Sequence, residues 1–129
     1  MSGDPPRLRI DVADCRPADS PGAWHVSWRL TSEDERPLQV QEAWVPHGRF
    51  RGEHRQALDQ VVPEGETSVV ELIVRAQEAA GTVVENAFLI LRVARDGEHW
   101  RVFARMRVDF DAAGIPRPLV EVVTNQQPD

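Results

Sequence analysis

The chain has 129 residues, 41% of them hydrophobic and 28% charged, and a formal net charge of −6. This length predicts one domain with an ordinary apolar core, and the acidic balance disfavours a general binder of nucleic acid or anionic membranes. All 15 basic residues are arginine, so Schiff-base chemistry on lysine and a lysine-bearing phosphate loop are excluded.

The amino-terminal residues Met1–Pro6 lack the basic and apolar regions of a secretory signal. No apolar run approaches the roughly 20 residues that a membrane helix needs. The single cysteine, Cys15, excludes an internal disulfide and fits a reducing compartment. We therefore expect a cytoplasmic protein without cofactor or metal, and without a nucleic-acid or membrane partner.

The predicted elements begin after a lead-in, residues 1–6, that we expect to be disordered. Alternating apolar residues predict strands over 7–13, 23–31 and 37–45, and the intervening loops are rich in proline, glycine and acidic residues. Four tryptophans fall on the apolar sides of predicted strands and are expected in the core: Trp24, Trp28, Trp44 and Trp100.

Residues 47–59 are polar and are predicted to be irregular, whereas residues 67–76 fit two structures. Their β-branched residues favour a strand. The spacing of Ser68 and Glu71 fits a helical capping box, however, and a helix near 68–80 would make the protein an α+β domain. The strand is our prediction and the helix its alternative.

Residues 84–110 predict a long β-hairpin, because two alternating runs flank Asp96-Gly97, the strongest short-range hairpin signal. A loop of two or four residues sets Val93 opposite Trp100 and gives one fully apolar face. A three-residue loop would set Arg92 against Trp100 and mix the faces, so we reject it.

A turn over 111–118, a short strand over 119–124 and a tail over 125–129 complete a single domain spanning 7–124. Seven or eight strands predict an all-β fold, an antiparallel two-sheet sandwich. The segment around Val61-Val62-Pro63, followed by glycine and a Thr/Ser-Val run, resembles bacterial immunoglobulin-like domains. The resemblance implies an immunoglobulin-like architecture, although the cysteine pair and tyrosine corner of antibody domains are missing.

The outer side of the hairpin is the first candidate site. Three apolar and three arginine residues form the predicted interface: Phe88, Ile90, Arg92, Arg101, Phe103 and Arg105. The register sets Arg92 directly opposite Arg101, and like charges across strands are destabilising, so the pair favours an anion between them. Aromatic and arginine residues are also the enriched anchors of protein interfaces.

Carboxylates on neighbouring strands offer the alternative interpretation of that surface. Glu71, Glu121 or Asp11 could neutralise the arginines, while a loop covers the aromatic side chains.

The polar segment 47–55 is the second candidate, because arginines on a loop can recognise phosphate or carboxylate. The predicted ligand-binding residues are His47, Arg49, Arg51, His54 and Arg55. The spacing of the two histidines fits no standard zinc ligand set. A solvated surface loop is the alternative.

Two further sequence patterns are weaker candidates for a site. Asp109–Gly114 begins like a calcium loop, but Ala113 and Val120 occupy ligand positions, so an ordinary turn is expected. Cys15 lies beside Arg16, which could lower the pKa of the thiol, but no matching histidine or nucleophile elbow accompanies it.

The sequence therefore predicts a non-enzymatic domain that binds protein through the hairpin's outer face, the partner being another protein or a second copy in a homodimer. The alternative function is a small anion-binding module using the 47–55 loop. An apolar interface should survive high salt, whereas an electrostatic site should weaken.

Overall fold

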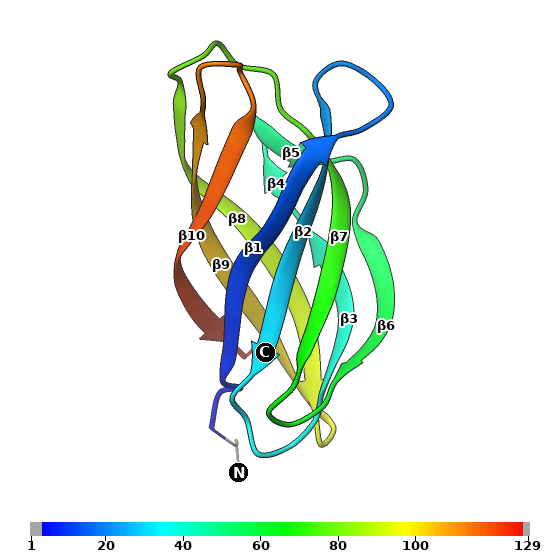
Figure 1. Cartoon of the computed structure of the whole chain (residues 1–129). Coiled ribbons are helices and arrows are strands. Elements are labelled where there is room, and N and C mark those ends of the chain that lie inside the picture. The colour runs from blue at the N-terminus through cyan, green and yellow to red at the C-terminus, as the bar shows by residue number, and fades with distance from the viewer. Residues whose placement is uncertain (1–3, 128–129) are drawn as a thin grey trace.

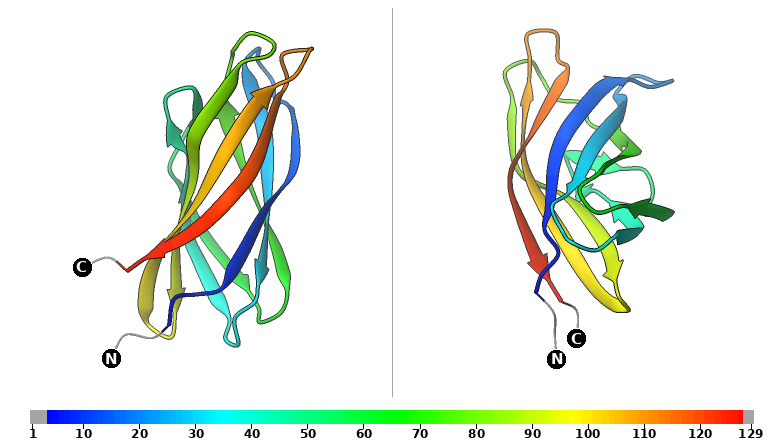
Figure 2. Two further views of the ribbon diagram at one scale, coloured as in Figure 1. Left: turned by 90° about the vertical axis from the view of Figure 1, so that its left-hand side faces the viewer. Right: turned by 60° about the horizontal axis from the view of Figure 1, so that its bottom comes forward.

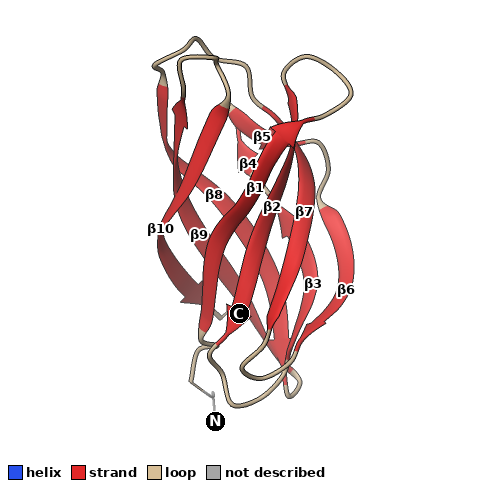
Figure 3. Cartoon of the chain, viewed as in Figure 1, coloured by secondary structure: helices blue, strands red, loops and turns tan. Residues whose placement is uncertain are grey.

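The computed structural model describes residues 4–127, which form ten strands joined by turns and loops (Figures 1 and 3). Sheet A has the order β1 (Leu8–Pro17), β2 (Ala23–Ser32), β7 (Thr67–Arg75), β5 (Phe50–Gly52) and β4 (Pro46–His47). Sheet B has the order β10 (Pro116–Gln126), β9 (Glu98–Phe110), β8 (Val83–Arg95), β3 (Leu38–Trp44) and β6 (Gln56–Val62). None of the described residues forms a helix, and so none forms one that could cross a membrane.

The two antiparallel sheets lie as two layers around one apolar core, which confirms the all-β prediction (Figure 2). Successive residues of a strand point to opposite faces, so every second side chain enters the core. Trp28 of sheet A and Met106 of sheet B are both fully buried, and the Trp28 indole N–H lies 3.3 Å from the Met106 sulfur. On one side of the molecule, β1 of sheet A lies beside β10 of sheet B (Figure 1).

The β8–β9 hairpin follows the predicted register. Arg95 pairs with Glu98, which leaves the two-residue loop Asp96-Gly97, and both loop residues have positive φ (49° and 79°). Positive φ at both positions is what a type I′ turn requires. Val93 therefore lies opposite Trp100, and the register shifts only near the open end, between Val84 and Ala87.

Trp44 was predicted in the core, and this prediction is wrong. The register of β3 shifts between Val40 and Glu42, and such a bulge reverses which side chains face inward. Ala43 is consequently buried, and Trp44 lies on the outer side opposite Ile90. The other three tryptophans are buried or pack against the core, as expected: Trp24, Trp28 and Trp100.

The segment predicted to be irregular, residues 47–59, contains the last residue of the short strand β4, the whole of the short strand β5 and the beginning of β6. Two of these strands, β4 and β5, have two and three residues, too few for a period-two pattern to show. Residues 4–127 therefore form ten strands where seven or eight were predicted. Residues 67–75 form the strand β7, so the helical alternative is wrong.

The chain ends are more structured than predicted. β1 continues past a bulge at Ala13 to Pro17, and β10 extends to Gln126, into the predicted tail. Pro6 of the predicted lead-in is buried. Residues 1–3 and 128–129 of the lead-in and tail lie outside the described residues.

Candidate interaction surface

The outer side of sheet B carries the predicted interface residues at the predicted pairings: Arg92 opposite Arg101, Ile90 opposite Phe103 and Phe88 opposite Arg105. Trp44 adds a fourth large apolar side chain beside Ile90. Because every described strand belongs to one of the two sheets, no described strand lies over this side of sheet B (Figure 2). We call this surface the aromatic–arginine face; it consists of Trp44, Phe88, Ile90, Arg92, Arg101, Phe103 and Arg105.

One ring contact joins two side chains in the apolar part of the face. The Phe88 and Phe103 rings meet edge to face at 90°, with centroids 6.3 Å apart. This geometry places the positive edge of one ring on the negative face of the other. Phe88, Ile90 and Phe103 are each half-buried, so part of their apolar surface remains open to a partner.

Arg92 and Arg101 form the charged centre of the face. They lie directly opposite one another, both are exposed, and neither makes an ion pair with any residue from 4 to 127. Glu42 of β3 lies directly opposite Arg92 of β8, but the Glu42 carboxylate is bound by the Arg55 guanidinium at 2.9 Å. The structure therefore holds two like charges side by side without a counter-ion among the described residues.

The other arginines of this side have partners. Arg105 lies 4.0 Å from Glu121, and Arg107 lies 2.9 Å from Asp109, whose carboxylate raises the pKa of the Arg107 guanidinium. Of the three carboxylates in the alternative interpretation, only Glu121 reaches the face. Glu71 and Asp11 lie on sheet A, where they pair with other groups.

Arg55 extends the face beyond the predicted residues. Its guanidinium carbon lies 3.8 Å from the centroid of the Trp44 ring, a cation–π contact. Sequence reasoning missed this pair because the β3 bulge, which turns Trp44 outward, leaves no mark in the alternation of apolar residues.

The structure brings together three of the five predicted anion-binding residues, since Arg51, His54 and Arg55 line one pocket of about 290 Å³, whereas His47 and Arg49 do not line it. Arg49 turns toward Glu78, which it contacts at 2.6 Å, and Arg55 lies on Trp44 at the sheet B side. The His47 imidazole accepts a hydrogen bond from the Arg49 backbone N–H at 3.0 Å. Arg51 lies opposite Arg75 in the backbone pairing of β5 with β7, and the His54 side chain is 80% exposed.

No family model, curated protein or solved structure matches the chain. The evidence for function therefore consists of the residues and their arrangement. In residues 4–127 no group of three or more His, Cys, Asp or Glu side chains is arranged to hold a metal ion.

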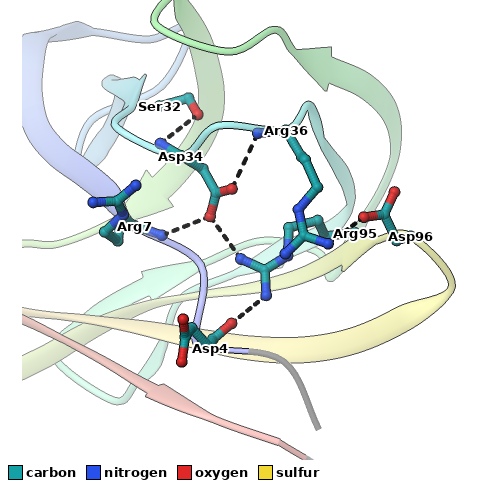
Figure 4. A network of polar contacts seen from close by, with 7 residues as sticks. All are labelled: Asp4, Arg7, Ser32, Asp34, Arg36, Arg95 and Asp96. Atoms are coloured by element: carbon teal, nitrogen blue, oxygen red, sulfur yellow. Dashed lines mark hydrogen bonds and ion pairs between the residues drawn. The ribbon is translucent and has the colours of Figure 1, made fainter. Parts of the chain in front are cut away.

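A buried ion pair lies near the hairpin turn (Figure 4). The Arg95 side chain is 2% exposed, and one of its terminal nitrogens donates to Asp34 at 2.6 Å. The other donates to the carbonyl of Asp4, which ties the start of the chain to β8. The Arg95 Nε is buried and has no hydrogen-bond partner among the described residues.

Asp34 is the centre of this network. Besides Arg95, its carboxylate accepts hydrogen bonds from the backbone N–H groups of Arg36 at 3.1 Å and Arg7 at 3.3 Å. Burial alone would raise the pKa of the Asp34 carboxyl, but the hydrogen bonds outweigh burial and hold the pKa below its ordinary value.

The remaining sequence candidates have structural roles. Cys15 packs against the core, and burial, reinforced by the charge of Asp14, raises the pKa of its thiol to about 11, so the expectation of a lowered pKa is wrong. The Asp111 carboxylate accepts hydrogen bonds from the N–H groups of Ala113 and Ile115, both at 2.9 Å. This is the turn that was expected in place of a calcium loop.

Proposed function

We propose that this protein is a non-enzymatic, cytoplasmic protein-interaction domain whose binding surface is the aromatic–arginine face. The observation that carries the proposal is the Arg92–Arg101 pair, which is exposed and lacks a counter-ion among the described residues. Half-buried aromatic side chains lie in the next row of the sheet. Guanidinium groups bind carboxylates through paired hydrogen bonds, and aromatic neighbours supply apolar contact area.

The strand order supports an immunoglobulin-like architecture as part of this proposal. In such domains strands A, B, E and D form one sheet and strands C, F and G form the other. Sheet A contains β1-β2-β7 in the places of A, B and E, and sheet B contains β9-β8-β3 in the places of G, F and C. The short β5 lies beside β7, where strand D would lie.

Charge favours a different protein over a second copy as the partner. A symmetric dimer pairs a surface with itself. A two-fold axis along the strands between β8 and β9 would set Arg92 over Arg101 of the other copy. An axis across the strands at Phe103 would set Arg101 over Arg105. Both arrangements bring arginines together, so the partner that fits is a protein surface with carboxylates beside apolar side chains.

Phe103→Glu tests this proposal, since it places a charge in the middle of the apolar row. We expect a folded variant that no longer captures a protein which the wild-type chain captures from extract of its source cells. The matched control is Val61→Glu, which changes a 55% exposed valine at the far edge of sheet B and should leave capture intact. Urea unfolding of both variants verifies that they fold.

The solution mass of the same proteins, measured at low and high salt, tests the choice of partner. We expect monomers at both salt concentrations. A salt-resistant dimer that Phe103→Glu converts to monomers would identify the partner as a second copy. Capture that is identical for wild type and Phe103→Glu would contradict the proposed surface.

The anion-binding module stays a prediction, and the geometry supports it less. Two of its arginines, Arg49 and Arg55, are held in ion pairs with Glu78 and Glu42. Titration with inorganic polyphosphate tests it: a melting temperature that rises at low salt, with the rise lost in an Arg49→Gln, Arg51→Gln variant, would support it.

A further inference from the structure

The edge of β7 is only partly paired. β7 pairs with β2 along its whole length, from Arg75 opposite Ala23 to Thr67 opposite Thr31. On its other side it pairs with β5 at only two residues, Arg75 and Val74. The next contact on that side is the Glu53 N–H, which donates to the Ile73 carbonyl at 3.0 Å. Among the described residues, no strand pairs through its backbone with the rest of this edge of β7.

The direction of the free backbone groups follows from this contact. In an antiparallel strand the N–H and C=O of one residue point to the same side, and the side alternates along the chain. The Ile73 carbonyl points away from β2, so the backbone groups of Glu71 and Val69 do as well. Among the described residues, Glu71 has no backbone hydrogen-bond partner on that side.

Gln60 occupies the lower end of this edge. Its side-chain amide crosses from β6 and donates to the Val69 carbonyl at 2.8 Å, and it also contacts the Ser68 hydroxyl. A carboxamide N–H thus takes the place that the backbone N–H of a neighbouring strand would occupy. Between the Gln60 contact and the Glu53 contact, about 13 Å of strand edge remains open, at roughly 3.3 Å per residue.

A pocket lies along this open edge. It has a volume of about 350 Å³ and lies between β6 and β7, which are neighbours in Figure 1. Leu58 and Leu72 give it an apolar part, and Ile73, 38% exposed, lies at its outer side. The Glu53–His54 turn borders its upper end.

We propose that this groove binds a short extended segment of another protein by strand addition to β7. The segment would exchange two backbone hydrogen bonds with Glu71. Side chains on either side of that position would enter the pocket at Leu58 and Leu72, so the ligand has aliphatic residues there. The Glu71 carboxylate already contacts Ser27, His25 and Arg16 on the side of β2 and β1, so a basic side chain opposite Glu71 would add a cationic partner on the groove side.

The dimensions of the site favour a single extended chain over the edge of a folded sheet. The open edge is bounded by Gln60 at one end and by the Glu53–His54 turn at the other. A second copy presenting its own edge would have to fit a whole sheet between these two boundaries, whereas one strand occupies a single position beside β7.

Hydrogen exchange of the free full-length protein is the first test. We expect the Glu71 amide to exchange at least about tenfold faster than the amides of Val70 and Leu72, which point to β2. Equal protection of the three amides would overturn the proposal, because the edge would then be closed.

The second test adds a ligand, the acetylated and amidated peptide Thr-Val-Arg-Val-Thr, and a control peptide methylated on the backbone nitrogen of its arginine. We expect the first peptide to slow exchange of the Glu71 amide and the control peptide to have no effect. Equal binding of both peptides, or no slowing at millimolar peptide, would overturn the proposal.

Two variants separate the contribution of the Glu71 backbone N–H to binding from that of the Glu71 carboxylate. Glu71→Pro removes the N–H that faces the groove, whereas Glu71→Thr keeps it, and both lose the same carboxylate. We expect binding to Glu71→Pro to be at least about tenfold weaker than to Glu71→Thr, the loss of one hydrogen bond. Equal binding would overturn the proposal. A dimer that Glu71→Pro dissolves and Glu71→Thr keeps would assign the groove to a second copy instead.

Discussion

Arg92 and Arg95 lie three residues apart on β8, and one is exposed while the other is buried. An odd separation along a strand puts two side chains on opposite faces, so Arg92 points outward and Arg95 points inward. Arg95 is buried and is bound by the Asp34 carboxylate and the Asp4 carbonyl. Arg92 is exposed, faces Arg101, and has no counter-ion among the described residues.

The difference separates a charge that holds the fold from a charge that is available for binding. A buried guanidinium loses its hydration, so it is tolerated only where the protein supplies hydrogen bonds in exchange. An exposed guanidinium keeps its hydration and costs the fold only the modest repulsion of its neighbour. Arg92 can therefore remain without a protein partner in the free chain and bind a carboxylate in a complex.

Arg95→Met should have the largest effect on stability, because it leaves the Asp34 carboxylate buried without its charged partner. Breaking a buried ion pair from one side costs about 3–5 kcal/mol. Arg92→Met, the matched control, should change the free energy of unfolding by less than about 0.5 kcal/mol, as exposed substitutions generally do. Urea unfolding of the two variants measures both values.

The double variant Asp34→Asn, Arg95→Met sharpens this test, because the asparagine side-chain oxygen can still accept a hydrogen bond from the backbone N–H groups that Asp34 binds. If the cost of Arg95→Met comes from an unpaired charge, removing both charges should restore much of the lost stability. Equal losses in Arg95→Met and Arg92→Met would contradict the distinction between the two arginines.

The sequence predicted the exposed Arg92–Arg101 pair and missed the buried Arg95–Asp34 pair. The Asp96-Gly97 turn fixed the hairpin register, and the register alone placed Arg92 opposite Arg101. The same alternation puts Arg95 on the side of Val93, which was the available signal for a buried charge. Its partner Asp34 is 61 residues away and lies in a loop, and no local pattern specifies such a contact.

Two further differences have local causes. The β3 bulge reversed the direction of Trp44, and a bulge depends on how neighbouring strands pair, which one strand's sequence does not specify. The ligand set predicted in the 47–55 loop is divided because Glu78 and Glu42, from other parts of the chain, each bind one of its arginines.

Acid should weaken the buried ion pair between Asp34 and Arg95. The pKa of the Asp34 carboxyl is lower in the folded protein than in the unfolded chain, where it is about 3.9. The folded state therefore gains stability from this group above the unfolded value, and loses it as the pH falls through the folded value. Asp34→Asn should flatten the decline of unfolding free energy below about pH 4.

Asp111 has a lowered pKa as well, first because of the hydrogen bond from the Ile115 N–H, so Asp34→Asn should reduce the acid decline without removing it. A wild-type decline that Asp34→Asn does not alter would contradict the lowered pKa. Urea unfolding between pH 3 and 7 gives the curves.

Arg101→Glu should have a small effect on stability and the opposite sign. It turns the repulsive pair with Arg92 into an attractive one, and the neighbour on its other side, Gln126 of β10, is uncharged, so the change should stabilise the fold by about 0.5 kcal/mol at low salt. The same change removes one of the two positive charges offered to a partner, so capture of that partner should fall while stability rises. Arg92→Glu is the control: it also removes one charge, but it sets a carboxylate directly opposite Glu42 of β3, so it should lose capture without the same gain in stability. Stability that falls in Arg101→Glu would mean that Arg101 already has a stabilising role in the free chain, and the charge at the centre of the face would then belong to the fold.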